Sequence, residues 1–318
     1  MSGHPKPPKG RARAGKLAFV LGGGGARGAL QVGALRALYE AGYRPDVLVG
    51  TSIGAANAAF VAIHGFTPDA LEGLEGVWRD AARRELLPAS FLRLTARLLL
   101  GRPRQAQDRT RARIRAFLVA HGIDPALTFG ELKVPLVLVA TDLSRFEPVL
   151  YGRDPDAPVL EGLLASMAIP PWVAPLRVGD RLLMDGGLLS NLPIEPALSQ
   201  GATRVIALSL ADPRGADDGA SPDAGGVGVG PLLTRMLVAV EYRQMYLEAR
   251  LAKERGVPLF VLNLRAKEPV PIWDFRRAAA LIEEGYEQAR RQIARWPDAL
   301  ALTPARPRPR PRGRAGSG

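Results

Sequence analysis

The stretch Gly50-Thr51-Ser52-Ile53-Gly54 decides the fold, because it places a serine hydroxyl between two segments of different character. The mainly apolar run 46–49 before it is typical of a buried strand, and the alanine-rich run 53–63 after it is typical of a tightly packed helix. A sharp strand-to-helix turn presents the serine Oγ atom free of neighbouring side chains. A Cβ atom at Gly50 or Gly54 would crowd the strand or helix beside this turn. The stretch therefore predicts a nucleophilic serine.

A second glycine-rich segment follows the apolar run 17–21, which we expect to form another buried strand. Residues 22–28 read Gly-Gly-Gly-Gly-Ala-Arg-Gly, and apolar residues then recur at helical spacing. Such a loop binds an anion, either a standing phosphate or the oxyanion of a reaction, and a plain turn without a ligand is the alternative. Its spacing also matches a dinucleotide-binding loop. Asp46, the acid at the right distance, falls at the start of the next strand rather than at its end, which weakens the dinucleotide interpretation.

Two later runs predict strands that end in an aspartate. The apolar run 134–140 is followed by Asp142, and the run 181–184 leads into Asp185 and two glycines. An aspartate at a strand end is more often a loop or helix cap than a catalytic group, and this alternative applies to Asp142. Asp185, which stands beside two flexible residues, is the stronger candidate for a catalytic carboxylate.

The rest of the chain predicts further elements of an α/β domain. We expect irregular helices over 70–122, a short helix over 160–167, strands over 205–210 and 259–264, long amphipathic helices over 231–254 and 274–296, and a mobile loop over 212–230.

The choice of general base follows from the histidines, which are His4, His64 and His121. An α/β-hydrolase orders its triad as serine, acid, histidine, and no histidine follows Asp185. His64 ends the helix that begins at the serine, about 17 Å away at 1.5 Å per residue. His121 stays open as a base, although its place before a glycine favours helix capping. A carboxylate that acts directly on the serine is the leading interpretation.

Three motifs together resemble the patatin-like phospholipases, which are lipid acyl hydrolases with a serine–aspartate dyad. In order, they are Gly-Gly-Gly-Ala-Arg-Gly at 23–28, Gly-Thr-Ser-Ile-Gly at 50–54 and Asp-Gly-Gly at 185–187. The stretches 165–170 and 191–193 also resemble this family, and the likeness covers about 17–300. The resemblance implies an α/β fold of three layers with a mostly parallel central sheet, and it implies neither a metal nor a cofactor.

By this resemblance Ser52 is the nucleophile and Asp185 is the general base. It assigns the oxyanion loop to Gly23, Gly24, Gly25, Ala26, Arg27 and Gly28, and Gly50, Gly54, Gly186 and Gly187 complete the motifs. A free aspartate has a pKa of about 3.9, so burial and a hydrogen bond to Ser52 are expected to raise its basicity. We expect such a base to keep activity below the imidazole range near pH 6.5. Arg27 either anchors the loop, which we prefer, or attracts the phosphate of a lipid.

Composition and charge narrow the class of protein. The chain of 318 residues is 47% hydrophobic, as in an ordinary globular protein, and it has no cysteine, which excludes disulfides and thiolate chemistry. The formal charge of +12 lies mostly at the ends, since residues 1–16 and 305–318 each carry five basic side chains and no acid. The body is close to neutral, which argues against a nucleic-acid partner, and both tails are expected to be disordered.

We therefore expect one catalytic domain over 17–304 between the two tails, with a lipid ester as its substrate. A regulatory member of the family that acts through partner binding is the alternative. Residues 88–122 carry eight arginines against one acid and predict either a cap that meets a lipid surface or, preferably, a helical pair with a solvated face. No apolar run of about 18 residues occurs and no secretory signal is evident, so we expect a cytoplasmic protein with at most peripheral membrane contact through the basic segments.

Overall fold

The computed structural model describes residues 15–84, 86–87, 103–212 and 229–296, and the statements below concern these ranges. The expectations about both tails, the first part of the arginine-rich segment and most of the loop after residue 212 lie outside the described residues. None of the described helices combines the length and the apolar character that crossing a bilayer requires.

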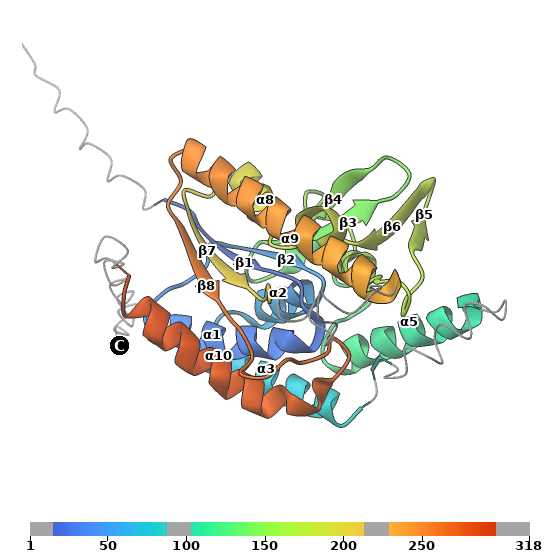
Figure 1. The fold of residues 1–318 in the computed structure, drawn as a ribbon, viewed down its shortest axis with the longest axis horizontal. Coiled ribbons are helices and arrows are strands. Elements are labelled where there is room, and N and C mark those ends of the chain that lie inside the picture. Colours follow the sequence, from blue (N-terminus) through green and yellow to red (C-terminus); the bar gives the residue numbers. More distant parts are fainter. Residues whose placement is uncertain (1–14, 85, 88–102, 213–228, 297–318) are drawn as a thin grey trace, which may run out of the picture.

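A single sheet of eight strands forms the centre of the molecule (Figure 1). The strands are β1 (Leu17–Leu21), β2 (Val47–Thr51), β3 (Leu136–Asp142), β4 (Glu147–Tyr151), β5 (Leu176–Val178), β6 (Arg181–Asp185), β7 (Arg204–Ser209) and β8 (Leu259–Asn263). Each strand in the series β5-β6-β3-β2-β1-β7-β8 is hydrogen-bonded to the next, and β4 also pairs with β3. The pairs among β8, β7, β1, β2 and β3 are parallel, whereas those that involve β4, β5 or β6 are antiparallel.

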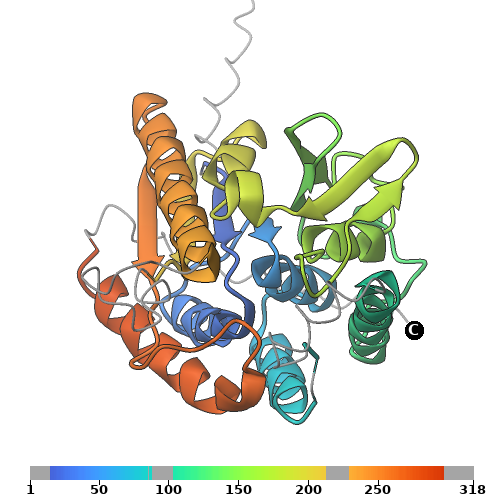
Figure 2. The same cartoon turned by 45° about the vertical axis from the view of Figure 1, so that its right-hand side comes forward.

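Helices cover both faces of this sheet (Figures 1 and 2). One layer contains α1 (Ala29–Glu40), α2 (Ile53–His64), α3 (Pro68–Ala82) and α10 (Ala278–Ile293), with α5 (Pro103–Ala120) and α6 (Val159–Ser166) beside them, and the other contains α8 (Ile194–Ser199) and α9 (Val229–Glu254). Strand β1 shows why, because Phe19 faces the first layer and Val20 the second. The expected three-layer α/β fold is confirmed.

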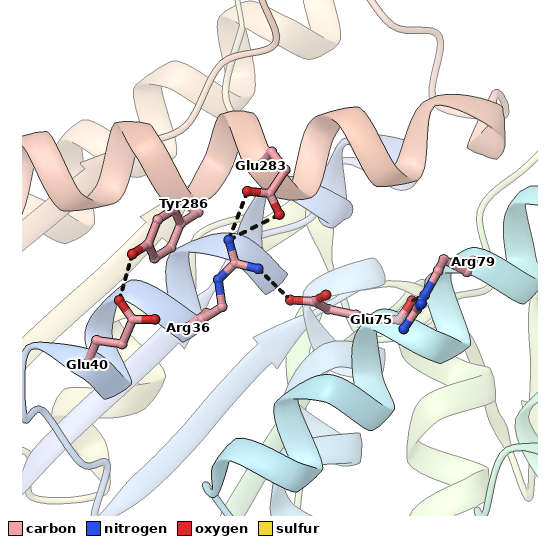
Figure 3. Close-up of polar contacts among 6 residues, drawn as sticks. All are labelled: Arg36, Glu40, Glu75, Arg79, Glu283 and Tyr286. Carbon is pink, nitrogen blue, oxygen red and sulfur yellow. Dashed lines mark hydrogen bonds and ion pairs between the residues drawn. The ribbon is translucent and has the colours of Figure 1, made fainter.

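The helices of the first layer also share polar contacts at the surface (Figure 3). Arg36 on α1 pairs with Glu75 on α3 at 2.9 Å and with Glu283 on α10 at 3.0 Å. The hydroxyl of Tyr286 donates to Glu40 at 2.7 Å. Because these groups are partly exposed, each pair contributes at most about 1 kcal/mol, and apolar packing supplies most of the stability of this layer.

All six strands expected from the sequence are present, with ends that shift by two residues at most. Strands β4 and β5 and the short helices α7 (Gly187–Ser190) and α8 are additions that the sequence analysis does not predict. β4 is partly exposed and contains Pro148, a residue that argues against a strand, and α7 and α8 are too short to show a helical period.

The described part of the arginine-rich segment packs against the body of the molecule. Ile114 and Phe117 of α5 are buried, and Arg111 donates to the Ala174 carbonyl at 2.7 Å. This half of the segment is a helix with one face packed on the body, and both the helical pair with a solvated face and the cap that meets a lipid surface stay predictions.

Candidate active site

Ser52 alone makes the turn between β2 and α2. Its backbone has φ 56° and ψ −125°, a left-handed conformation that costs a residue with a side chain about 1–3 kcal/mol. The Ser52 N–H donates to Ser166 Oγ at 2.9 Å, and the Thr51 hydroxyl donates to the Ser190 carbonyl at 2.9 Å. These two hydrogen bonds, to α6 and to α7, hold the strained backbone in place, as in a nucleophile elbow.

The glycines on either side of the serine allow this turn to pack tightly. A Cβ atom at Gly54 would lie 2.2 Å from the Leu21 carbonyl oxygen, and one at Gly50 would lie 2.7 Å from the Ala55 Cα atom. Helix α2 therefore begins directly against the end of β1, where the glycine loop starts.

Asp185 reaches the serine because β2 and β6 share one edge of β3. β4 pairs with residues 138–142 of β3, β2 with 136–139 and β6 with 140–142. A strand has only two edges, and β4 overlaps both partners, so β2 and β6 both lie on the other edge. They meet there end to end, with Thr51 opposite Val139 and Asp185 opposite Ala140. Two residues far apart in the sequence, Ser52 and Asp185, are thereby brought together.

The Asp185 carboxylate is buried, with only 5% of the residue exposed. Its Oδ1 atom accepts the Gly187 N–H at 2.8 Å, and its Oδ2 atom has no hydrogen bond of standard geometry within the described chain. Burial raises the pKa of Asp185 from 3.8 to about 6, and the nearby Ser52 hydroxyl and the Gly187 N–H offset this only in part. The rise in pKa expected from burial is present, whereas the expectation for the hydrogen bond to Ser52 was wrong, because a hydroxyl that donates to the carboxylate stabilises its charged form and lowers the pKa. The pH profile of activity stays a prediction, and a pKa of about 6 places its midpoint just below the imidazole range.

Several peptide groups of the glycine loop already make hydrogen bonds within the protein. The Gly22 carbonyl accepts Gln31 Nε2 at 2.8 Å, and the Gly23 N–H donates to the Asn191 carbonyl at 3.0 Å. The Ala26 N–H donates to the Ile272 carbonyl at 2.8 Å. Three of the loop's peptide groups thus serve to fix its course.

The N–H groups of Gly24 and Gly25 make no hydrogen bond within the described ranges. Gly25 has φ 57°, and a Cβ atom there would lie 2.4 Å from the Ile272 carbonyl oxygen. The Gly24 carbonyl accepts both the backbone N–H of Arg27 at 3.3 Å and its Nε atom at 3.2 Å. Arg27 is thus bonded to its own loop, in line with an anchoring role, and Gly28 packs so closely that its Cβ atom would lie 2.6 Å from Ile53 Cγ1.

A buried network of uncharged side chains supports the loop from the first helix layer. Asn57 Nδ2 on α2 donates to the Gly28 carbonyl and to Gln31 Oε1, each at 3.0 Å. Trp78 Nε1 on α3 donates to Asn57 Oδ1 at 2.9 Å. Sequence analysis missed this network, although a polar residue at the buried positions of two apolar helices was a usable signal.

Helix α9 supports the opposite side of the site with a polar stripe. Asn191 Nδ2 donates to Glu241 Oε1 at 2.5 Å, and the Ser190 hydroxyl donates to Glu248 Oε1 at 2.6 Å. Gln244 Nε2, between the two glutamates, donates to the Leu188 carbonyl at 2.5 Å. Burial raises the pKa of Glu248 to about 7 and also raises that of Glu241, which Arg27 and Asn191 lower in part. No sequence motif pointed to these residues.

The other residues that the sequence offered as a base or carboxylate partner of Ser52 have different contacts. His64 is the last residue of α2 and stacks on Phe60. His121 donates through Nδ1 to the Phe117 carbonyl at 2.8 Å, a helix-end contact, and His4 lies outside the described residues. Asp142 accepts the Ser144 N–H at 2.8 Å, as a loop cap does. Among the described residues, the groups brought to the serine are Asp185 and the glycine loop.

Comparison with known proteins identifies the family of this chain. A family model described as patatin-like phospholipase matches residues 19–198. An uncharacterized NTE family protein of Mycobacterium tuberculosis is 32% identical over 210 residues, which make up 66% of this chain and 52% of that protein. The uncharacterized protein YqhO of Bacillus subtilis is 32% identical over 212 residues, or 60% of this chain and 70% of that protein.

Larger proteins also match. Patatin-like phospholipase domain-containing protein 7 of Mus musculus is 29% identical over 204 residues, which are 61% of this chain and 13% of that protein. The match spans about half the length of the mycobacterial relative. Among solved structures, VipD from Legionella pneumophila aligns with a TM-score of 0.47 and 15% identity, covering 89% of this chain and 67% of that one.

Proposed function

Because the chain belongs to the patatin-like phospholipase family, we propose that it hydrolyses carboxylic esters of phospholipids or neutral lipids through an acyl-enzyme on Ser52. Asp185 acts as the general base. The observation that carries this proposal is the end-to-end meeting of β2 and β6 on β3, which sets a strained serine beside a buried carboxylate.

In the first half-reaction Asp185 takes the Ser52 hydroxyl proton while Oγ attacks the ester carbonyl carbon. The carbonyl electrons move to its oxygen, and this oxyanion accepts hydrogen bonds from the N–H groups of Gly24 and Gly25, which have no other acceptor within the described ranges. One well-placed donor of this kind is worth about 3 kcal/mol. The intermediate then expels the alcohol, which leaves with the proton from Asp185.

In the second half-reaction Asp185 takes a proton from water, whose oxygen attacks the acyl-Ser52 carbonyl. The same two N–H groups stabilise the new oxyanion. The bond to Ser52 Oγ breaks, the serine recovers its proton from Asp185, and the carboxylic acid is released.

The raised pKa of Asp185 suits this role. A shift from 3.8 to about 6 strengthens the carboxylate as a base by roughly 3 kcal/mol. The group still lies mainly in its charged form at neutral pH, so little of the enzyme is lost to protonation. A histidine is therefore not needed to bring the base near the working pH.

A fluorophosphonate probe and a panel of p-nitrophenyl and phospholipid esters test the proposal. We expect one adduct, mapped to Ser52 by mass spectrometry, and ester turnover that falls by at least about 10⁴-fold in Ser52→Ala and about 10³-fold in Asp185→Asn. Ser199→Ala is the matched control, since that hydroxyl donates to the Pro196 carbonyl at the end of α8. An adduct on another residue, or full turnover in either variant, contradicts the assignment. No turnover of any ester favours the regulatory alternative.

A further inference from the structure

Asn191 stands between the glycine loop and the segment that carries Asp185. Its backbone carbonyl accepts the Gly23 N–H at 3.0 Å. A Cβ atom at Gly23 would lie 2.3 Å from Asn191 Oδ1, and one at Gly187 would lie 2.8 Å from the same atom. The Asn191 side chain thus fills the space that these two glycines leave open, and it contacts both halves of the proposed site.

Glu241 determines which end of the Asn191 amide faces the glycines. Its Oε1 atom accepts Asn191 Nδ2 at 2.5 Å. A flipped amide would set Oδ1 against the carboxylate, oxygen against oxygen, and lose this charge-assisted hydrogen bond. With Glu241 in place, Oδ1 is directed to Gly23 and Gly187.

Glu241 also acts on the loop through a charge. The Arg27 guanidinium attracts the Glu241 carboxylate, and Arg27 Nε donates to the Gly24 carbonyl at 3.2 Å. The Gly24 carbonyl and the Gly25 N–H belong to one planar peptide group, so an Arg27 that holds the carbonyl also sets the direction of the N–H. Glu241 therefore reaches the loop at Gly23 through Asn191 and at Gly24 through Arg27.

Burial of a carboxylate destabilises a fold relative to a neutral side chain of similar shape. Glu241 is partly buried, and that burial opposes its charge. Stability therefore does not explain a carboxylate at this position, whereas the orientation of the groups that Glu241 contacts does.

We propose that Glu241 and Asn191 form a positioning pair that sets the Gly24 and Gly25 N–H groups relative to Asp185. This inference rests on the proposed function. Neither residue touches the reacting atoms in this mechanism. The pair aligns donors for an oxyanion that exists only during reaction, so its loss lowers kcat with little change in KM.

A charge swap tests the pair. Kinetics with a water-soluble ester are measured at pH 8, where Asp185 is ionised, and below the thermal unfolding midpoint of each variant. We expect Glu241→Ala to lower kcat by about 10–100-fold with KM within about twofold. Asn191→Asp sets two carboxylates against each other and lowers kcat by about 100-fold or more. Adding Glu241→Gln reverses the donor and acceptor, and we expect it to recover at least about tenfold of kcat.

Glu254→Gln is the matched control, because this α9 residue is exposed and pairs only with Arg250 among the described residues. Its kcat is expected to be unchanged. If Asn191→Asp does not fold, Glu241→Gln alone keeps the acceptor for Asn191 and removes the charge, and its kcat should fall between the alanine variant and the unsubstituted protein. The proposal is overturned if adding Glu241→Gln to Asn191→Asp does not recover kcat, or if kcat and KM change in parallel. Unchanged kcat in Glu241→Ala overturns this inference alone, whereas an inactive unsubstituted protein overturns it together with the proposed function.

Discussion

Two supports of opposite chemistry hold the proposed site. On the side of the first helix layer, Gln31, Asn57 and Trp78 form a network with at most 3% of any residue exposed and no charge. On the other side, Glu241 and Glu248 of α9 hold Asn191 and Ser190 with partly buried carboxylates. The first support holds the ends of the glycine loop, and the second holds the segment after Asp185.

The two supports both hold the site in place, but the stability that they contribute depends differently on pH. The neutral network has no titratable group, and its hydrogen bonds are the same at any pH at which the protein is folded. A carboxylate whose pKa is raised on folding binds a proton more tightly in the folded state. Glu248, with a pKa of about 7 against 4.5, therefore contributes stability that is complete below pH 4.5 and is lost as the pH rises through 7.

Breaking the neutral network should produce the largest effect on stability. Asn57→Leu removes the hydrogen bonds that Asn57 makes to three buried groups, namely the Gly28 carbonyl, Gln31 Oε1 and Trp78 Nε1. At about 1–3 kcal/mol for each, we expect the free energy of unfolding to fall by roughly 4 kcal/mol. Urea unfolding at pH 6 and pH 8 should give the same loss. Asn263→Leu, at an exposed strand end, is the control, and a loss that varies with pH would contradict the comparison.

The charged support should respond to pH instead. Above pH 7 the unsubstituted protein buries an ionised Glu248, and below pH 4.5 it does not, so its unfolding free energy falls with rising pH by about 3 kcal/mol from this group. Glu248→Gln removes that slope, and urea unfolding across pH 5–8 measures it as the difference between the two curves. Glu283→Gln, in the exposed ion pair of Figure 3, should leave the slope unchanged. If the unfolding free energies of Glu248→Gln and of the unsubstituted protein change with pH in parallel, Glu248 is not the source of the slope.

The smallest of these effects concerns the proposed base, Asp185. Since the base must be charged, kcat/KM of the free enzyme should be level near neutral pH and fall about tenfold per unit below a midpoint near 6. The profile is measured with a soluble ester. His121→Gln should leave the midpoint in place, because His121 pairs with Asp80 and is not part of the site. A midpoint near 4 would indicate an unburied aspartate, and a midpoint that moves in His121→Gln would indicate a histidine base.

Local sequence patterns predicted the parts of the fold with strong local signals. The run 17–21 is apolar on both faces, so it predicts a buried parallel strand without knowledge of its neighbours. β4 lacked such a signal because it depends on β3 for its hydrogen bonds and contains Pro148. Gln31 and Asn57 looked like ordinary helix residues because their partners come from other elements.

The sequence by itself determined the elbow at Ser52, the glycine loop and the absence of a histidine after Asp185. These follow from backbone geometry and residue inventory, which act over a few positions. Only the tertiary structure decided that β2 and β6 meet on one edge of β3, that the Gly24 and Gly25 N–H groups find no acceptor among the described residues, and that burial raises the pKa of Asp185. Strand pairing, hydrogen-bond competition and desolvation depend on groups distant in the chain, so no local pattern encodes them.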